Sequence, residues 1–199
     1  MHLVRPLVLA SKSPRRISLL RQIGFDPIVI EADVPEDFRD DETPVENALR
    51  LALKKARAIE PSVKDAIIVG ADTIVVLDGQ LLGKPENTQD AHRMLRMLSG
   101  RTHTVITGFA LLDVPTRKWT TEFEQTRVTF RELPDDEIAE YVSGGSPMDK
   151  AGAYGIQDDY GAVFVTRIEG CFYNVEGFPL AKFYSTLKQF QAQLTNETH

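Results

Sequence analysis

The chain has 199 residues, of which 42% are hydrophobic and 26% are charged, a balance typical of a soluble globular protein with a sizeable core. Its net charge of −6 argues against a protein that binds nucleic acid through a broad basic face. The single cysteine, Cys171, excludes an internal disulfide framework and a metal site built from cysteines, and it fits a reducing compartment.

No stretch of the sequence approaches the ~20 apolar residues of a membrane helix. The apolar run near the start is also too short for a signal peptide. We therefore expect a cytoplasmic protein that binds neither membranes nor nucleic acid. The chain shows no internal repeat, and its length suits one domain or two tightly joined lobes.

The first strand and the first helix are expected to meet within LASKSPRRISLL, residues 9–20. Residues 6–10 are apolar and predict a short strand. Ser13 is placed as the N-cap of the following helix, with Pro14 at its first position, and Gly24 offers a stop.

Ser11, Arg15 and Arg16 lie at this junction of strand and helix. Free backbone N–H groups and the positive end of the helix dipole gather at such a place. Two guanidinium groups added there favour an anion site, for example one for phosphates.

A second strand is expected over residues 26–32, and an acidic loop over residues 33–42. Thr43 and Glu46 have the spacing of a capping box, which predicts a helix from this point to about Ile59.

Residues 66–77, AIIVGADTIVVL, form an apolar stretch that is interrupted at residues 70–72. The dipeptide Asp78-Gly79 then predicts a hairpin turn into residues 80–85.

The second half of the chain is richer in β-patterned sequence. Its expected elements are a helix from Thr88 to a cap at Gly100, strands over 102–114 and 119–133, a helix over 134–142, a strand over 161–170, and a helix over 179–194 with a frayed tail. Strands and helices are mixed without regular alternation. We therefore expect one α/β or α+β domain, residues 1–199, whose mixed sheet is flanked by helices in two lobes around a cleft.

Asp72 is a carboxylate inside an apolar strand pattern, where a lone charge is costly to bury unless it is paired. One interpretation is an aspartate that caps a loop at the end of a strand or faces solvent. The other is a carboxylate at the mouth of a cleft that binds a divalent cation or activates water.

A solvated surface position and a role in a ligand site are likewise both open for Lys55, Lys84 and Glu36. Lys84 lies between a glycine and a proline, where an exposed turn lysine is the simpler explanation. Lys55 fits the solvated face of a helix, and Glu36 fits a solvated acidic loop. Taken together with the arginines, however, these residues supply the charges that a site for a polyphosphate and a divalent metal needs.

Residues 146–161, SPMDKAGAYGIQDDYG, place small residues and glycines around Lys150 and Gln157. Such a backbone can approach a ligand closely, but ordinary loops have the same composition.

Five stretches resemble, in order, the successive motifs of the Maf family of nucleoside triphosphate pyrophosphatases: LASKSPRRISLL, VGADTIVVLDGQLLGKP, MLRMLSGRTHTVITG, DKAGAYGIQ and NVEGFPL. The similarity runs from about Leu7 to Leu180, and DKAGAYGIQ resembles the branch that acts on dTTP and UTP. The resemblance implies a fold related to inosine triphosphate pyrophosphatases, and a homodimer. It also implies hydrolysis of dTTP and UTP to the monophosphate and pyrophosphate, with Mg²⁺ or Mn²⁺, as a house-cleaning activity against non-standard pyrimidine nucleotides.

The resemblance also implies roles for individual residues. The family's proton acceptor falls on Asp72, and its metal ligands fall on Glu36 and Asp72. Its substrate-specificity positions fall on Arg15, Thr73 and Gln157. Its phosphate-binding positions fall on Ser11, Arg16, Lys55, Lys84 and Lys150.

The chemistry of Gln157 fits this assignment. Its amide has one acceptor and two donors, which complement N3–H and O4 of uracil or thymine. Because these bases differ by one methyl group, which a pocket discriminates by only about 10- to 200-fold, we expect action on both dTTP and UTP.

The sequence departs from the family pattern at two places. Asp158, Asp159 and Tyr160 follow YGIQ, where the family usually has glycine or another small residue. Two carboxylates near a triphosphate would weaken its binding or alter the base preference. Glu176 and Phe178 stand where the branch more often has an apolar residue and Leu, which we interpret as mild drift.

Two alternatives to this function are considered. One is a pyrophosphatase for another modified or purine triphosphate. The other is a nucleotide-binding regulator of septum formation, which would bind triphosphates without turning them over. The presence of Asp72, Lys84 and Arg15 argues against an inactive enzyme.

Overall fold

The computed structural model describes residues 2–157 and 160–196. These residues divide into two compact units. Unit 1 takes the described residues of Met1–Asp72, Thr107–Glu124 and Gly177–His199. Unit 2 takes those of Thr73–Ile106 and Gln125–Glu176.

In the described residues the strands form one sheet of seven strands, in the order β2-β1-β3-β5-β6-β7, with β4 paired to β3. The strands are β1 (Leu7–Leu9), β2 (Ile28–Val29), β3 (Ile67–Leu77), β4 (Gln80–Leu82), β5 (Thr102–Asp113), β6 (Trp119–Phe130) and β7 (Val165–Glu169). β1 is parallel to β2 and to β3, whereas β4 and β7 are antiparallel to their partners. The expected mixed sheet flanked by helices is therefore confirmed.

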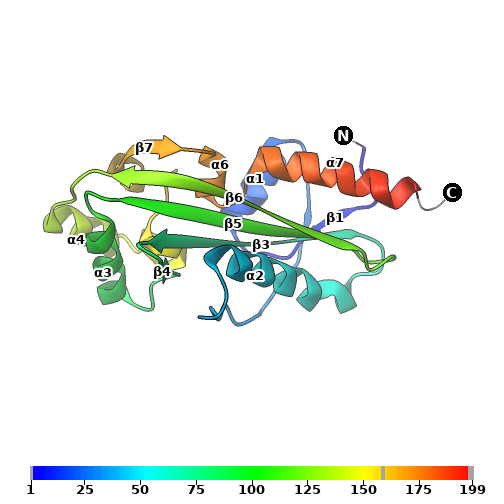
Figure 1. Ribbon diagram of the computed structural model, residues 1–199, viewed down its shortest axis with the longest axis horizontal. Coiled ribbons are helices and arrows are strands. Elements are labelled where there is room, and N and C mark those ends of the chain that lie inside the picture. Colours follow the sequence, from blue (N-terminus) through cyan, green and yellow to red (C-terminus); the bar gives the residue numbers. More distant parts are fainter. Residues whose placement is uncertain (1, 158–159, 197–199) are drawn as a thin grey trace. The chain divides into compact units, whose positions relative to one another are not determined.

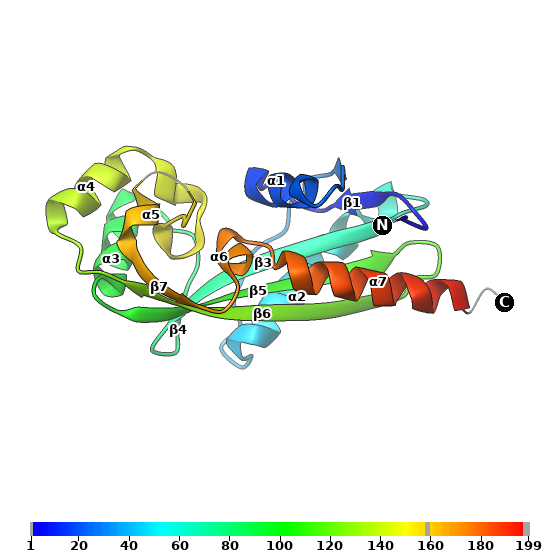
Figure 2. The same ribbon diagram turned by 90° about the horizontal axis from the view of Figure 1, so that it is seen from above.

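In unit 1 the strands are covered by helices on both faces. α2 lies on one face, and α1 and α7 lie on the other (Figures 1 and 2). The helical elements of unit 1 are α1 (Pro14–Gln22), α2 (Pro44–Ile59), η1 (Glu60–Ser62) and α7 (Leu180–Asn196). None of the helices in the described part of the chain has the length and apolar character needed to cross a membrane.

The predicted capping box starts α2. The Thr43 hydroxyl accepts a hydrogen bond from the Glu46 N–H at 3.2 Å, and the Glu46 carboxylate accepts one from the Thr43 N–H at 2.7 Å. Two of the N–H groups left over at the helix start are thereby satisfied. The helix then runs to Ile59, as expected.

α2 packs on the sheet at unusually short range, because the facing strand positions have no side chain. A Cβ added at Gly70 of β3 would lie 2.0 Å from the Ala52 carbonyl oxygen of α2. A Cβ added at Gly108 of β5 would lie 2.8 Å from the Ala48 carbonyl oxygen. Backbone therefore meets backbone at both points, and any larger residue would force the helix away from the sheet.

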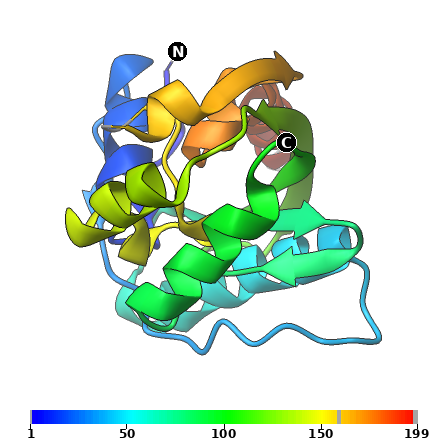
Figure 3. The same cartoon turned by 90° about the vertical axis from the view of Figure 1, so that its left-hand side faces the viewer.

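Unit 2 contains α3 (Thr88–Leu98), α4 (Asp135–Ser143), η2 (Ser146–Asp149), η3 (Ala151–Ala153), α5 (Gly161–Phe164) and α6 (Phe172–Glu176). α3 packs against α4 and against the short helices η2 and η3, and α4 packs against η2 (Figure 3, α3 in green and α4 in yellow-green). α3 begins at Thr88 as expected, and the side chain of Asn87 caps it by accepting from the Asp90 N–H at 2.9 Å. Ala91, Leu95 and Leu98 face the core, which their spacing predicts.

Ser13 stands at the N-cap position of α1 and Pro14 at its first position, as predicted, although the Ser13 side chain makes no capping bond and its backbone N–H donates to the Ser11 hydroxyl at 3.1 Å. Two other local predictions are wrong. The second strand covers only Ile28–Val29, which pair with Val8 and Leu9 of β1.

The expected strand over residues 161–170 begins only at Val165. The four residues before it form the helical turn α5, which carries Phe164 into the core against the rings of Phe130 and Tyr141. The short helix α6 was not expected either. In the expected tail, Thr195 and Asn196 continue α7, and the remaining residues lie outside the described part of the chain.

The contact between α2 and β3 predicts the effect of Gly70→Ala. The added methyl group would collide with the backbone of α2, so we expect the free energy of unfolding to fall by about 3 kcal/mol or more, measured by urea denaturation. Gly144→Ala is the matched control, because its Cβ would meet no atom closer than 3.4 Å. We expect the control to change stability by less than about 1 kcal/mol. A loss that small in Gly70→Ala would show that α2 can move away from the sheet at little cost.

Candidate active site

Asp72 is a buried carboxylate in the middle of β3, and only 6% of its surface is exposed. Side chains alternate between the two faces of a strand, so Asp72 shares a face with Gly70, the face that α2 covers. Its Oδ1 accepts a hydrogen bond from the Lys55 Nζ of α2 at 2.5 Å. The interpretation of Asp72 as an exposed residue at the end of a strand is therefore wrong, and the cost of burying its charge is offset by an ion pair.

Lys55 joins two carboxylates. Its Nζ also donates to Glu36 Oε1 at 2.6 Å, so both acidic side chains meet at one ammonium group. Lys55 is 6% exposed, which rules out the solvated helix face as its position. The sequence did hold a signal for this: Lys55 follows Ala48 and Ala52 at helical spacing and so lies on the apolar face of α2, whereas Lys54 does not.

Glu36 belongs to an acidic segment that is bound to α2. Asn47, which is fully buried in α2, accepts from the Arg39 N–H at 2.9 Å and donates to the Arg39 carbonyl at 3.0 Å. Lys54 donates to the Pro35 carbonyl and to Asp37, both at 2.8 Å. Residues 33–42 have no regular secondary structure, but these contacts fix the segment and hold Glu36 beside Lys55.

The electrostatics of Asp72 reflect its burial. Burial raises the pKa of Asp72 above the usual value for an aspartate, while the charges of Lys55 and Arg16 act in the opposite direction. A carboxylate with a raised pKa is a better proton acceptor. The two cations favour its ionised form, in which it can accept a proton.

Arg16 lies in the first turn of α1, and two contacts hold its guanidinium. Nε donates to the Gly177 carbonyl at 3.0 Å, and Nη1 lies 3.4 Å from the Ser11 hydroxyl. Burial lowers the pKa of Arg16, and the neighbouring charge of Arg15 adds to this lowering. Arginine nevertheless stays charged at neutral pH. The Gly177 carbonyl is a part of this arrangement that sequence reasoning missed, although it lies in the NVEGFPL motif.

Unit 1 thus brings together the candidates Ser11, Arg15, Arg16, Glu36, Lys55 and Asp72 by hydrogen bonds, ion pairs or short-range charge effects. The other four candidates, Thr73, Lys84, Lys150 and Gln157, belong to unit 2. A single site that contains all ten residues stays a prediction.

Within unit 2, Lys150 is 7% exposed and donates to the Ser146 carbonyl at 2.5 Å and to Asp149 at 2.9 Å. The Gly152 N–H donates to the Gly83 carbonyl at 3.0 Å, which ties the glycine-rich segment to the exposed turn that carries Lys84. Asp158 and Asp159 depart from the family pattern and are predicted to weaken triphosphate binding or alter the base preference. Both residues lie outside the described part of the chain.

The carboxylates of Glu36 and Asp72 fit the metal role that the sequence resemblance implies. Mg²⁺ in nucleotide enzymes is commonly held by one or two carboxylates, with phosphate oxygens and water as the remaining ligands. Glu36 and Asp72 meet at one cation already, the Lys55 ammonium. Within the described residues no group of three or more His, Cys, Asp and Glu side chains is arranged to hold a metal by itself.

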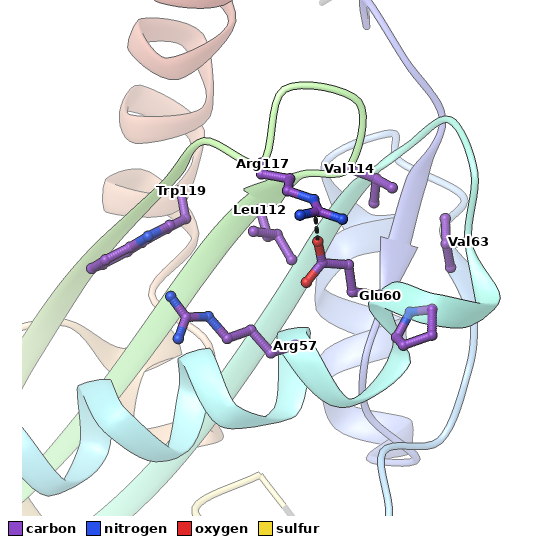
Figure 4. Close-up of a pocket in the computed structure, with 8 residues that line it drawn as sticks. Arg57, Glu60, Val63, Leu112, Val114, Arg117 and Trp119 are labelled. Carbon is purple, nitrogen blue, oxygen red and sulfur yellow. Dashed lines mark ion pairs between the residues drawn. The ribbon is translucent and has the colours of Figure 1, made fainter.

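A groove of about 600 Å³ in unit 1 contains none of these candidates. It lies between the end of α2 and the hairpin that joins β5 to β6 (Figure 4). The Arg57 guanidinium lies 5.6 Å from the centre of the Trp119 ring, and Arg117 lies 3.9 Å from the Glu60 carboxylate. Both arginines of the groove thus have a partner on its own walls.

The comparisons with known proteins cover almost the whole chain. A dTTP/UTP pyrophosphatase of Dictyoglomus turgidum is 45% identical over 187 residues, 94% of this chain and 96% of that protein. A dTTP/UTP pyrophosphatase of Syntrophus aciditrophicus is 46% identical over 186 residues, 94% of this chain and 90% of that protein.

A solved HAM1 protein from Coxiella burnetii is more distant, with 17% identity and a TM-score of 0.45 over 96% of this chain and 98% of that chain. The family described as Maf-like protein matches residues 6–190. This range includes every candidate residue named above, and the chain therefore belongs to the Maf-like protein family.

Proposed function

We propose that this protein is a pyrophosphatase that hydrolyses dTTP and UTP to the nucleoside monophosphate and pyrophosphate. The proposal is supported by its family and by relatives of more than 40% identity that carry this name. The observation that carries it is the buried Asp72 carboxylate, which the Lys55 ammonium joins to Glu36. This arrangement combines a proton acceptor with charges suited to a triphosphate.

In the proposed reaction, water attacks the α-phosphorus of the triphosphate. A new bond forms between the water oxygen and the α-phosphorus, and the bond from the α-phosphorus to the bridging oxygen of the β-phosphate breaks. Asp72 takes a proton from the attacking water. Pyrophosphate leaves with the electron pair of the broken bond. Raising the pKa of Asp72 by burial supports this role, since the carboxylate must hold a proton for part of the cycle.

The cations of the site stabilise the charge that develops on the phosphate oxygens. Arg16 is oriented by the Gly177 carbonyl and the Ser11 hydroxyl, so its planar donor groups are held ready before substrate arrives. Ser11, Arg16, Lys55, Lys84 and Lys150 are assigned to phosphate binding in this proposal. Glu36 and Asp72 are assigned to Mg²⁺ or Mn²⁺, which when bound neutralises phosphate charge and polarises the phosphoryl oxygen.

Base selection is assigned to Gln157, Thr73 and Arg15. Gln157 can pair with N3–H and O4 of a pyrimidine, and a purine would leave these amide groups unpaired. On the resemblance to its family we also propose a cytoplasmic homodimer that removes non-standard pyrimidine nucleotides.

Pyrophosphate release tests the function directly. We expect dTTP and UTP to be hydrolysed at least about 100-fold more efficiently than ATP and GTP, because a site that loses paired polar contacts discriminates strongly. The assay is run with Mg²⁺, with Mn²⁺ and with excess chelator, and chelator should abolish turnover. Preferred hydrolysis of a purine or modified triphosphate would favour the first alternative. Tight binding without turnover would favour the regulator.

Asp72→Asn should lower kcat by about 10²- to 10⁴-fold, the range typical of losing a general base. Binding of a non-hydrolysable dTTP analogue, measured by calorimetry, should change much less. Asp26→Asn is the matched control, because Asp26 forms an exposed ion pair with Arg21 at 3.0 Å that the proposed site does not use. The control should leave kcat within about twofold. Equal loss of binding and turnover in Asp72→Asn would assign Asp72 to the metal or to structure.

Gln157→Ala should raise the KM for dTTP and UTP by about 10-fold or more, because the polar edge of the base loses its partner. The KM for ATP and GTP should change by less than about threefold. Gln89→Ala, an exposed glutamine on α3 of the same unit, is the control and should have no effect on either group. An equal rise for all four triphosphates would remove Gln157 from base selection.

A further inference from the structure

The segment Gly152–Gln157 is anchored in unit 2 by side chains that the proposed chemistry does not use. Its anchor is Tyr154, which is buried among aromatic rings. The ring centres of Phe130 and His103 lie 4.7 and 5.3 Å from that of Tyr154, both edge to face. Such contacts fix the plane of the Tyr154 ring as well as its position.

His103 makes the polar contact in this cluster. It comes from the start of β5, is 2% exposed, and its Nε2 lies 2.7 Å from the Tyr154 hydroxyl. Burial lowers the pKa of His103 to about 4, so the imidazole is neutral at pH 7. Burial likewise raises the pKa of the Tyr154 hydroxyl, which stays protonated. The hydrogen bond therefore joins two neutral groups in an apolar setting.

A core position with packing as its only role would not need these polar atoms. Phe130 and Phe164 fill neighbouring positions of the same cluster without a polar group. Burying an imidazole and a hydroxyl costs free energy unless they pair, and pairing requires a defined geometry. The pair thus fixes Tyr154 in a way that apolar packing alone would not.

Two further contacts hold the residues around Tyr154. The Tyr141 hydroxyl accepts from the Gly155 N–H at 3.2 Å. The Gly152 N–H donates to the Gly83 carbonyl at 3.0 Å, and a Cβ at Gly152 would lie 2.9 Å from the Val75 side chain. The backbone is therefore held on both sides of Tyr154, only three residues before Gln157.

We propose that His103 and Tyr154 are positioning residues that set the place of Gln157 and thereby the preference for pyrimidine bases. The proposal rests on the role of Gln157 in the proposed function. His103 and Tyr154 act through the backbone: the fixed ring of Tyr154 determines where the chain leaves toward Gln157. Gln157 lies only three residues beyond Tyr154, a span of at most about 11 Å, so its place depends directly on where the anchor holds the chain.

The test is Tyr154→Phe, which removes only the hydroxyl. We expect kcat/KM for dTTP and UTP to fall about 10-fold, chiefly through KM, and kcat/KM for ATP and GTP to change by less than about threefold. In a Gln157→Ala background, Tyr154→Phe should cause no further loss of selectivity, because the amide that it positions is gone. Tyr184→Phe, at an exposed tyrosine of α7, is the control and should leave all values unchanged.

Tyr141→Phe tests the same segment independently, since it removes the acceptor of the Gly155 N–H. It should shift selectivity in the same direction as Tyr154→Phe. The double variant His103→Phe/Tyr154→Phe leaves no polar group of the pair unpaired, and it should be no less selective than Tyr154→Phe alone. Thermal unfolding of each variant shows whether it is folded at the assay temperature.

Three results would overturn the proposal: an equal loss for all four triphosphates, unchanged selectivity in both Tyr154→Phe and Tyr141→Phe, or a full additional loss in the Gln157→Ala background. Failure of the proposed function would give a result different from these three. In that case the wild-type protein would show no preference for dTTP and UTP, and both proposals would fall together. A selective wild type with equally selective Tyr154→Phe and Tyr141→Phe variants would contradict only the positioning role.

Discussion

The close contact between α2 and the strands beneath it is the constraint on which the candidate active site depends. Gly70 and Gly108 let the helix backbone touch the sheet, and Ala48 and Ala52 keep the helix side of the contact small. Lys55 follows Ala52 by three residues on the same helix face, and Asp72 follows Gly70 by two on the same strand face. The short contact therefore brings the ammonium to the carboxylate, and a wider spacing would leave two buried charges apart.

The position of Glu36, in turn, depends on a segment whose composition is that of a solvated acidic loop. The acidic residues 33–42 would repel one another in isolation. Asn47, Arg50 and Lys54 of α2 bind their backbone and their charges, so Glu36 reaches Lys55 from a fixed position. Charges held in place before substrate binds need no reorganisation during the reaction, which is the main physical advantage of such a site.

In unit 2, neutral groups rather than charges hold the corresponding segment in place. Its glycine-rich segment has little side-chain bulk of its own, so its position depends on what it packs against. The hydroxyls of Tyr154 and Tyr141 supply directional contacts, and the carbonyl of Gly83 ties the segment to the turn that carries Lys84. Loops that bind ligands commonly owe their precision to such a scaffold rather than to their own sequence.

The sequence by itself determined the features whose energies are local. The capping box of α2, the apolar face of α3 and the turn at Asp78-Gly79 follow from contacts within a few residues, and motif order was enough to indicate the family. Only the tertiary structure decided the pairing of Lys55 with Asp72, the short β2 and the helical turn that carries Phe164. These depend on partners distant in the chain: 17 residues separate Lys55 from Asp72, and 51 separate His103 from Tyr154. A local pattern carries no information about such partners, because the free energy of burying a polar group is set by what the fold places beside it.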